Sequence, residues 1–203
     1  MRSSAGKDAG GRPAVGGDRY ELRLAGEGGQ GLILAGLILA EAAVVYDGKH
    51  ATQTQSYGPE ARGGASKSEV VIDTGEIDYP KVTEADALLA MSQEACDRYV
   101  LGLRKGGILI VDSVHVKRVL FAANPYRVPI TEIAEQETGR RITGNVVGLG
   151  VLVGLTGVVS RPALEAAVAA RAPRGTAELN LRALAAGFQM AERLKRQVYV
   201  GGK

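Results

Sequence analysis

Two patterns of hydrophobic and polar positions along the chain predict β-strands. Strict alternation occupies residues 19–25 (RYELRLA) and 67–73 (KSEVVID), which suits strands with one buried face. Short apolar runs occupy residues 86–91 (DALLAM) and 107–111 (GILIV), as in strands buried on both faces of a parallel sheet. These four segments therefore predict the centre of a sheet.

Two further segments predict strands at the margins of that sheet. Residues 50–55 (HATQTQ) are polar enough to lie at an edge or to face a partner. Residues 126–130 (YRVPI) contain Pro129, which would interrupt a central strand and so favours a short edge strand.

The segment 30–46 is apolar on almost every face, which predicts a helix buried between the sheet and another layer. Ser160, with Pro162 in the first turn, and Thr176 are suitable N-terminal caps for two of the remaining helices. Those remaining elements are a helix that Gly106-Gly107 would end, a short turn and three longer helices, at 93–104, 131–138, 144–159, 161–171 and 177–196. Strands alternating with helices predict an α/β fold: a mostly parallel sheet with flanking helices, Rossmann-like, followed by a C-terminal helical cluster.

The length of 203 residues suits one domain. Residues 1–18 lack the apolar core of a signal peptide and predict a flexible tail, which leaves residues 19–203 as a single α/β domain. No stretch reaches the ~18 apolar residues that a membrane span needs, so we expect no membrane association. The net charge of +3 is a mild bias without an aromatic and basic RNA-binding signature, so no nucleic-acid partner is expected.

The single cysteine, Cys96, limits the chemistry of this chain. One thiol forms no intramolecular disulfide, no cysteine-based zinc site and no iron–sulfur cluster held by this chain alone. The count indicates a reduced, cytoplasmic protein in which Cys96 is a small core residue.

A glycine-rich turn, GEGGQG at residues 26–31, lies between the first strand and the first helix. Its glycines fit the G-x-G-x-x-G dinucleotide fingerprint, and the helix N-terminus offers N–H groups to a phosphate or carboxylate. No acidic residue ends the next strand, where a ribose would be bound. Three interpretations stay open: a nicotinamide or flavin site, another anion or phosphate site, and a tight turn that needs glycine for packing. The candidate contacts are Gly26, Gly28, Gly29, Gln30 and Gly31.

The loop SYGPEARGG at residues 56–64 is a second candidate. Arg62 and Gly63 could present a guanidinium beside bare backbone N–H groups, as in an anion clamp. We expect this loop at the ligand-binding end of the sheet, near the glycine turn. A surface arginine paired with Glu60 explains the same residues.

The segment 144–159 (GNVVGLGVLVGLTGVV) carries glycines at small-xxx-small spacing, which predicts a groove for another helix. That helix belongs either to this chain or to another subunit.

Taken together, five motifs resemble the gamma subunit of 2-oxoacid:ferredoxin oxidoreductases, from about residue 20 to residue 189. They occur in the family's order: GEGGQG, SYGPEARGG, VVID with IDYPKV, ADALLAMSQEA and GNVVGLG. The form of SYGPEARGG looks closer to the 2-oxoglutarate and 2-ketoisovalerate branches than to the pyruvate branch, and an indolepyruvate-type relative stays open. The N-terminal tail has no counterpart in the family pattern.

The resemblance implies a complex that decarboxylates a 2-oxoacid, releases an acyl-CoA and reduces ferredoxin. Thiamine diphosphate, Mg and the iron–sulfur clusters are then held by alpha, beta and in some cases delta subunits, so this chain alone carries no cofactor, no metal and no catalytic residue. Its implied role is structural, or to help coenzyme A enter, and the isolated chain is expected to be inactive. A free-standing NAD- or FAD-binding protein and a scaffold module without redox chemistry are the alternatives.

Overall fold

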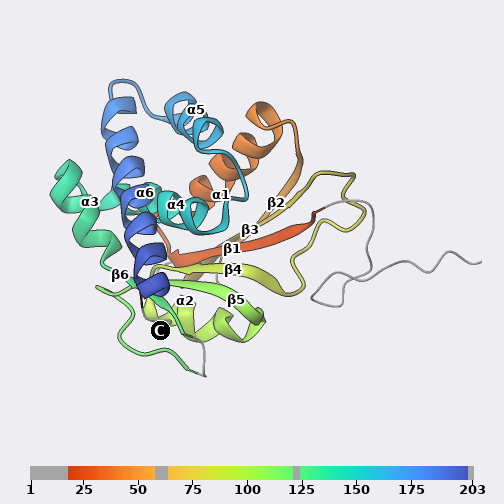
Figure 1. Cartoon of the computed structure of the whole chain (residues 1–203), viewed down its shortest axis with the longest axis horizontal. Coiled ribbons are helices and arrows are strands. Elements are labelled where there is room, and N and C mark those ends of the chain that lie inside the picture. Colours follow the sequence, from red (N-terminus) through yellow and green to blue (C-terminus); the bar gives the residue numbers. More distant parts are fainter. Residues whose placement is uncertain (1–17, 58–63, 121–123, 201–203) are drawn as a thin grey trace, which may run out of the picture.

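The computed structural model describes residues 18–57, 64–120 and 124–200, without the side chains of 198–200. The expected N-terminal tail therefore lies outside the described residues, apart from Asp18. Within these ranges one six-stranded sheet lies between two layers of helices (Figure 1).

The strands follow the order β2-β3-β1-β4-β5-β6. The pairs β1–β4, β4–β5 and β5–β6 are parallel, whereas β3 runs antiparallel to both β1 and β2. The short connection between β2 and β3 explains this exception, because a parallel crossover needs a dozen or more residues. The mostly parallel sheet is confirmed, with strands Tyr20–Glu27 (β1), His50–Ser56 (β2), Ala65–Asp73 (β3), Ala85–Ala90 (β4), Leu103–Asp112 (β5) and Tyr126–Val128 (β6).

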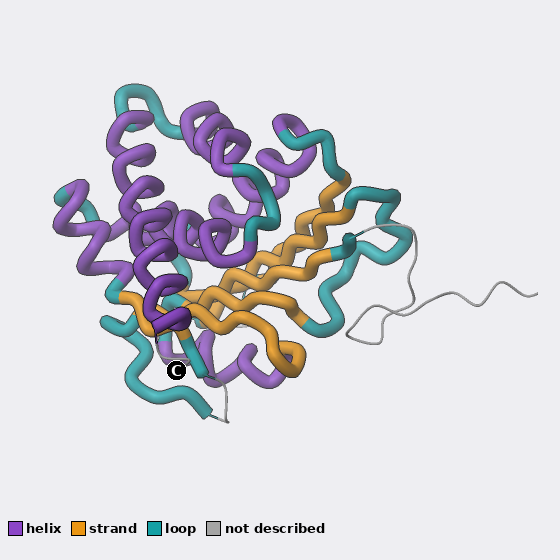
Figure 2. Tube along the Cα trace, in the orientation of Figure 1, coloured by secondary structure: helices purple, strands orange, loops and turns teal. Residues whose placement is uncertain are grey.

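The helices divide unequally between the two faces of the sheet, as Figures 1 and 2 show. Helix α2 and the 3-10 turn Val100–Gly102 cover one face, where α2 packs mainly against β1 and also against β3 and β4, and they enclose the smaller apolar cluster. The larger core lies on the other face. The helices there are Leu32–Glu41 (α1, continued by the π-helical turn Ala42–Tyr46), Ile130–Thr138 (α3), Gly144–Thr156 (α4), Arg161–Arg171 (α5) and Ala177–Val200 (α6); α2 spans Gln93–Tyr99. In the part of the chain that is described, no helix combines the length and apolarity needed to cross a membrane.

The glycines of α4 are explained by close packing inside this chain. A Cβ on Gly150 would lie 2.5 Å from the Leu184 carbonyl oxygen, and one on Gly187 would lie 2.2 Å from the Val147 carbonyl oxygen. The backbones of α4 and α6 therefore touch. Gly148 instead faces the sheet, where its Cβ would lie 2.9 Å from Leu89 Cδ2. The second helix that the small-residue spacing predicts is α6, so this groove is filled within the chain.

Several boundaries differ from the sequence prediction, and three of them change the interpretation of a segment. Helix α2 ends at Tyr99, and Gly106 and Gly107 lie inside β5 rather than ending a helix. The pairing of β5 with β4 shifts register here, Gly106 has a φ of +78°, and a Cβ on Gly107 would lie 3.0 Å from the Asp86 carbonyl oxygen. A β-bulge thus required these glycines. Residues 131–138, expected as a short turn, form helix α3, and β6 ends at Val128 before Pro129.

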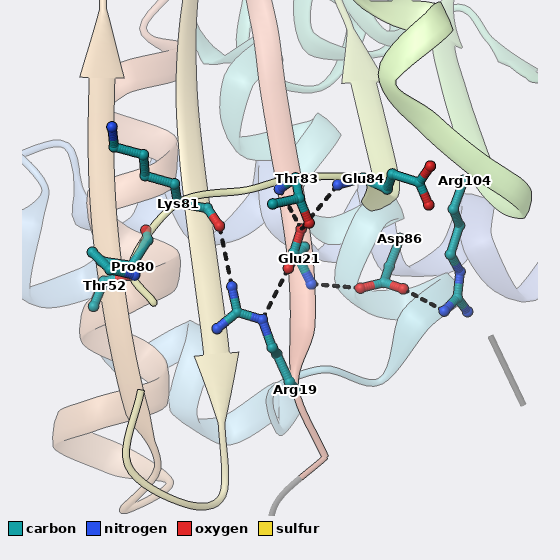
Figure 3. Close-up of polar contacts among 9 residues, drawn as sticks. All are labelled: Arg19, Glu21, Thr52, Pro80, Lys81, Thr83, Glu84, Asp86 and Arg104. Atoms are coloured by element: carbon teal, nitrogen blue, oxygen red, sulfur yellow. Dashed lines mark hydrogen bonds and ion pairs between the residues drawn. The ribbon is translucent and has the colours of Figure 1, made fainter. Parts of the chain in front are cut away.

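A buried polar cluster fixes the amino-terminal ends of β1 and β4 (Figure 3). The Glu21 carboxylate, 2% exposed, accepts hydrogen bonds from the Thr83 N–H at 2.7 Å and from Arg19 Nε at 2.9 Å. The Asp86 carboxylate accepts the Glu21 N–H at 2.6 Å and pairs with Arg104 at 2.6 Å. These contacts hold the segment before β4 against the sheet. They lie at the amino-terminal ends of the strands, opposite the carboxyl ends where the candidate site is found.

Candidate functional site

The glycine-rich turn lies where the sequence places it, between β1 and α1. Gly29 and Gly31 have φ values of +93° and +76°, in the left-handed region that favours glycine. Gly31 is the N-terminal cap residue of α1, and no side chain caps this helix. The backbone therefore enters α1 through a conformation that a side chain at either position would strain.

Gln30 closes the turn from inside. Its Oε1 accepts the Glu27 N–H at 2.8 Å, and its Nε2 donates to the Met91 carbonyl oxygen at 3.2 Å. A Cβ on Gly26 would lie 2.3 Å from this Oε1, so Gly26 is needed for packing. Gly28 is exposed, and a Cβ there would meet no atom within 4 Å. In this turn, Gly26 is thus needed for packing against Gln30, whereas the backbone at Gly28 and Gly29 is open to a ligand.

A cleft of about 210 Å³ opens beside this turn, beyond the carboxyl ends of β4 and β5. Crevices at this end of the strands are where ligands bind in open α/β sheets. The cleft brings together residues from five separate segments: Gly29, Gln30, Met91, His115, Thr131, Arg141, Ile142 and Asn145.

Three helices begin at this cleft. Gly31 caps α1, while Thr131 and Asn145 are each the second residue of their helices, α3 and α4. The Asn145 Nδ2 donates to the Gly31 carbonyl oxygen at 3.2 Å and so ties the start of α4 to the start of α1. Each helix N-terminus carries a partial positive charge. The local field therefore favours a negatively charged group.

Beside its neutral polar residues, the rim carries one arginine, one histidine and two apolar side chains. Arg141 is largely exposed, and its Nε donates to Glu135 Oε2 at 2.9 Å. His115 is about two-fifths exposed. Met91 is buried, whereas Ile142 exposes 58% of its surface. This composition suits a ligand that has both an anionic and an apolar part.

Asp112 supports the site from below. Its carboxylate is fully buried at the end of β5, accepts the Thr131 hydroxyl and receives the Val114 N–H at 3.1 Å. His115 Nε2 lies 4.0 Å from the same carboxylate. Asp112 therefore caps the turn after β5 and joins this turn to the start of α3. These contacts fix the positions of His115 and Thr131 at the rim of the cleft.

Arg62 and Gly63 lie outside the described residues, so their contribution stays a prediction. The residues that flank their loop are described. Ser56 ends β2, and Ala65 begins β3 opposite Glu27, the last residue of β1. The residues that flank the loop thus lie at the same end of the strands as the glycine turn.

Several rim residues were missed by sequence reasoning. His115, Thr131 and Arg141 carry no motif of their own, and the pairing of distant segments brings them together. Asn145 lies inside the GNVVGLG motif, and the polar residue in an apolar run was the available signal.

No metal site emerges within the described part of the chain, where no three His, Cys, Asp or Glu side chains gather as ligands. Cys96 is completely buried on α2, as expected of a core residue. Burial, reinforced by the nearby Asp97, raises the pKa of this thiol. It is therefore kept neutral and unreactive.

Comparison with known proteins covers nearly all of the described chain. The pyruvate ferredoxin/flavodoxin oxidoreductase family matches residues 21–190. The 2-oxoglutarate synthase subunit KorC of Methanocaldococcus jannaschii is 49% identical over 87% of this chain and 96% of its own length. The solved keto/oxoacid ferredoxin oxidoreductase gamma subunit of Geobacter sulfurreducens is 52% identical, with a TM-score of 0.79 over 87% of this chain and 98% of that chain.

More distant relatives differ in what surrounds the shared region. The pyruvate synthase subunit PorC of Methanocaldococcus jannaschii is 32% identical over 73% of this chain and 83% of its own. The ketoisovalerate oxidoreductase subunit VorA of Methanothermobacter thermautotrophicus is 36% identical over 84% of this chain but only 36% of its own length. A 2-oxoglutarate:ferredoxin oxidoreductase from Magnetococcus marinus, solved with 2-oxoglutarate, coenzyme A and succinyl-CoA bound, shares the fold at 22% identity. Its TM-score is 0.73 over 86% of this chain and 31% of that chain.

Proposed function

Because the chain belongs to the pyruvate ferredoxin/flavodoxin oxidoreductase family, we propose that it acts as the gamma subunit of a 2-oxoglutarate:ferredoxin oxidoreductase. The observation that carries this function is the 49% identity to a 2-oxoglutarate synthase subunit along 96% of that subunit's length. Identity falls to 36% and 32% for the ketoisovalerate and pyruvate relatives, which favours 2-oxoglutarate as the 2-oxoacid. A free-standing NAD- or FAD-binding protein finds no support in these relatives.

The redox chemistry belongs to other subunits. A [4Fe–4S] cluster needs four thiolates, and this chain has one cysteine, which is buried. The residues of this chain therefore do not fit an iron–sulfur cluster. Thiamine diphosphate, Mg and the clusters are assigned to alpha and beta subunits, with or without a delta subunit. The assembled complex is assigned to the cytoplasm. The matched region is about a third of VorA and of the Magnetococcus chain, so in those proteins the same domain works joined to a much longer polypeptide.

The cleft beside the glycine turn is proposed to hold part of coenzyme A. Three helix N-termini, Arg141 and the open backbone of Gly28 and Gly29 suit a phosphate, while Met91 and Ile142 suit an apolar segment. At about 210 Å³ the cleft is smaller than the roughly 300–1,000 Å³ of sites that enclose a drug-sized ligand. The rest of coenzyme A would then lie against the partner subunits.

Kinetics of the assembled complex test this proposal through neighbouring arginines. Arg141→Ala removes a cation from the cleft, whereas Arg140→Ala makes the same change one residue away, where the side chain does not line it. Loss of a charge-assisted hydrogen bond costs about 1.5–3 kcal/mol, so Arg141→Ala should raise KM for coenzyme A about ten- to a hundredfold. KM for 2-oxoglutarate should stay unchanged. Equal effects of the two variants on KM for coenzyme A would contradict the proposal.

Arg62 is tested in the same assay. Arg62→Ala should raise KM for coenzyme A more than KM for the 2-oxoacid. Arg62→Lys should recover part of the loss, because lysine keeps the charge but not the forked donor geometry.

A further inference from the structure

The sheet ends on one side at β2, which forms its upper right edge in Figure 1. All seven residues of β2 pair with β3, without a register shift. In the part of the chain that is described, no strand pairs with the other side of β2. The N–H and C=O groups on that side can therefore receive another strand.

The opposite edge of the sheet is protected, whereas β2 is not. Strand β6 has three residues, lies between Pro125 and Pro129 and carries Arg127, all of which discourage edge pairing. Strand β2 (HATQTQS) is longer, has no proline and carries no formal charge at pH 7. Two copies of this strand can lie side by side without repulsion between like charges.

Apolar side chains flank β2 at both ends. Val44, Val45 and Tyr46, which precede the strand, expose 47%, 63% and 42% of their surfaces. Tyr57, which follows it, exposes 68%. When two copies of a strand pair antiparallel, the start of one lies beside the end of the other. Tyr57 of one copy would then contact Val45 and Tyr46 of the second, and the same contact would occur again by symmetry.

We propose that β2 pairs antiparallel with β2 of a second copy of this chain, around a two-fold axis normal to the sheet. The two sheets then join into one, the α1 layers of both copies lie on the same face, and the two groups of exposed apolar residues become buried. This contact is independent of the coenzyme A cleft, which lies beyond β4 and β5 and stays accessible to partner subunits.

Sedimentation of the full-length chain over a range of concentrations tests the contact. We expect a reversible dimer of about twice the 21.2 kDa of one chain. Thr52→Lys/Thr54→Lys places four positive charges together at the centre of the pair and should raise the dimer dissociation constant about tenfold or more. Thr52→Glu/Thr54→Glu should do the same. A mixture of the two variants should form a heterodimer about as tight as the original dimer, because unlike charges then face each other.

The control adds the same charge elsewhere. Gln136→Lys/Gln189→Lys changes exposed residues of α3 and α6, far from β2 in Figure 1, and should leave dimerisation unchanged. Circular dichroism checks that every variant is folded. A chain that stays monomeric up to about millimolar concentration overturns the proposal. The proposal is also overturned if the dimer dissociation constants of the double-lysine and double-glutamate variants of β2 equal that of the control variant. If hydrogen exchange in β2 slows only when partner subunits are added, the strand's occupant is a partner and the homotypic contact is wrong.

Discussion

Substitution of Gly187 by alanine tests the contact between the backbones of α4 and α6. The new Cβ would lie 2.2 Å from the Val147 carbonyl oxygen and 2.9 Å from the Gly150 Cα, so α6 must move away from α4. Overpacking costs about 1–3 kcal/mol, and two backbone neighbours place this site in the upper part of that range. Alanine returns up to about 1 kcal/mol through its higher helix propensity. We expect a net loss of about 1–2 kcal/mol in the free energy of unfolding.

Gly148→Ala is the matched control, because it makes the same substitution at the contact between α4 and the sheet. Its Cβ would approach Leu89 Cδ2 at 2.9 Å, the end of a flexible side chain that can rotate. We expect a change within about 0.5 kcal/mol of zero, since a small clash and the propensity gain cancel. Urea unfolding measures both variants. Equal stability of Gly187→Ala and Gly148→Ala would refute backbone contact as the reason for these glycines.

Gly31→Ala should lower the free energy of unfolding by about 1–3 kcal/mol, because Gly31 has positive φ and a Cβ there would lie 2.5 Å from Asn145 Nδ2. Gly28→Ala, which points into open space, should change it by less than about 0.5 kcal/mol in the same denaturation assay. Burial raises the pKa of Cys96 above 9.0, so this thiol keeps its proton in the folded chain at a pH where the unfolded chain has lost it. Stability should therefore be complete below pH 9.0 and fall as pH rises through the folded pKa, and Cys96→Ala should reduce that slope in a pH series of unfolding curves. The pKa of Tyr20 is also raised from 10.0 by burial and by Asp86, so the part of the slope above pH 10.0 should remain in this variant.

The regular elements of the fold were predictable because each rests on a local pattern. Alternation in 67–73 and the apolar run in 86–91 correspond to β3 and β4, and Ser160 caps α5 by accepting the Ala163 N–H, as expected. Gly106-Gly107 was misread because a helix end and a β-bulge both favour glycine at positive φ. The pairing of β4 with β5 decides between them, and a local pattern does not contain it.

The candidate site likewise has one part that follows from local sequence and one part that depends on tertiary packing. The turn at residues 26–31 was predictable because all its glycines are adjacent in sequence. The cleft was not predictable, because His115, Thr131 and Arg141 reach it from three segments that are separate in sequence. The inward contact of Gln30 with Met91 also depends on the pairing of β1 with β4.

Reconstitution of 2-oxoglutarate oxidation tests the central claim most directly. The rate of viologen reduction and the yield of succinyl-CoA would be measured for this chain alone, for its alpha and beta partners alone, and for all subunits together. We expect no turnover by this chain alone, and turnover dependent on coenzyme A when it is combined with its partners. Full activity of the partners without this chain, or 2-oxoglutarate oxidation by this chain alone, would contradict its assignment as a required gamma subunit without its own redox centre.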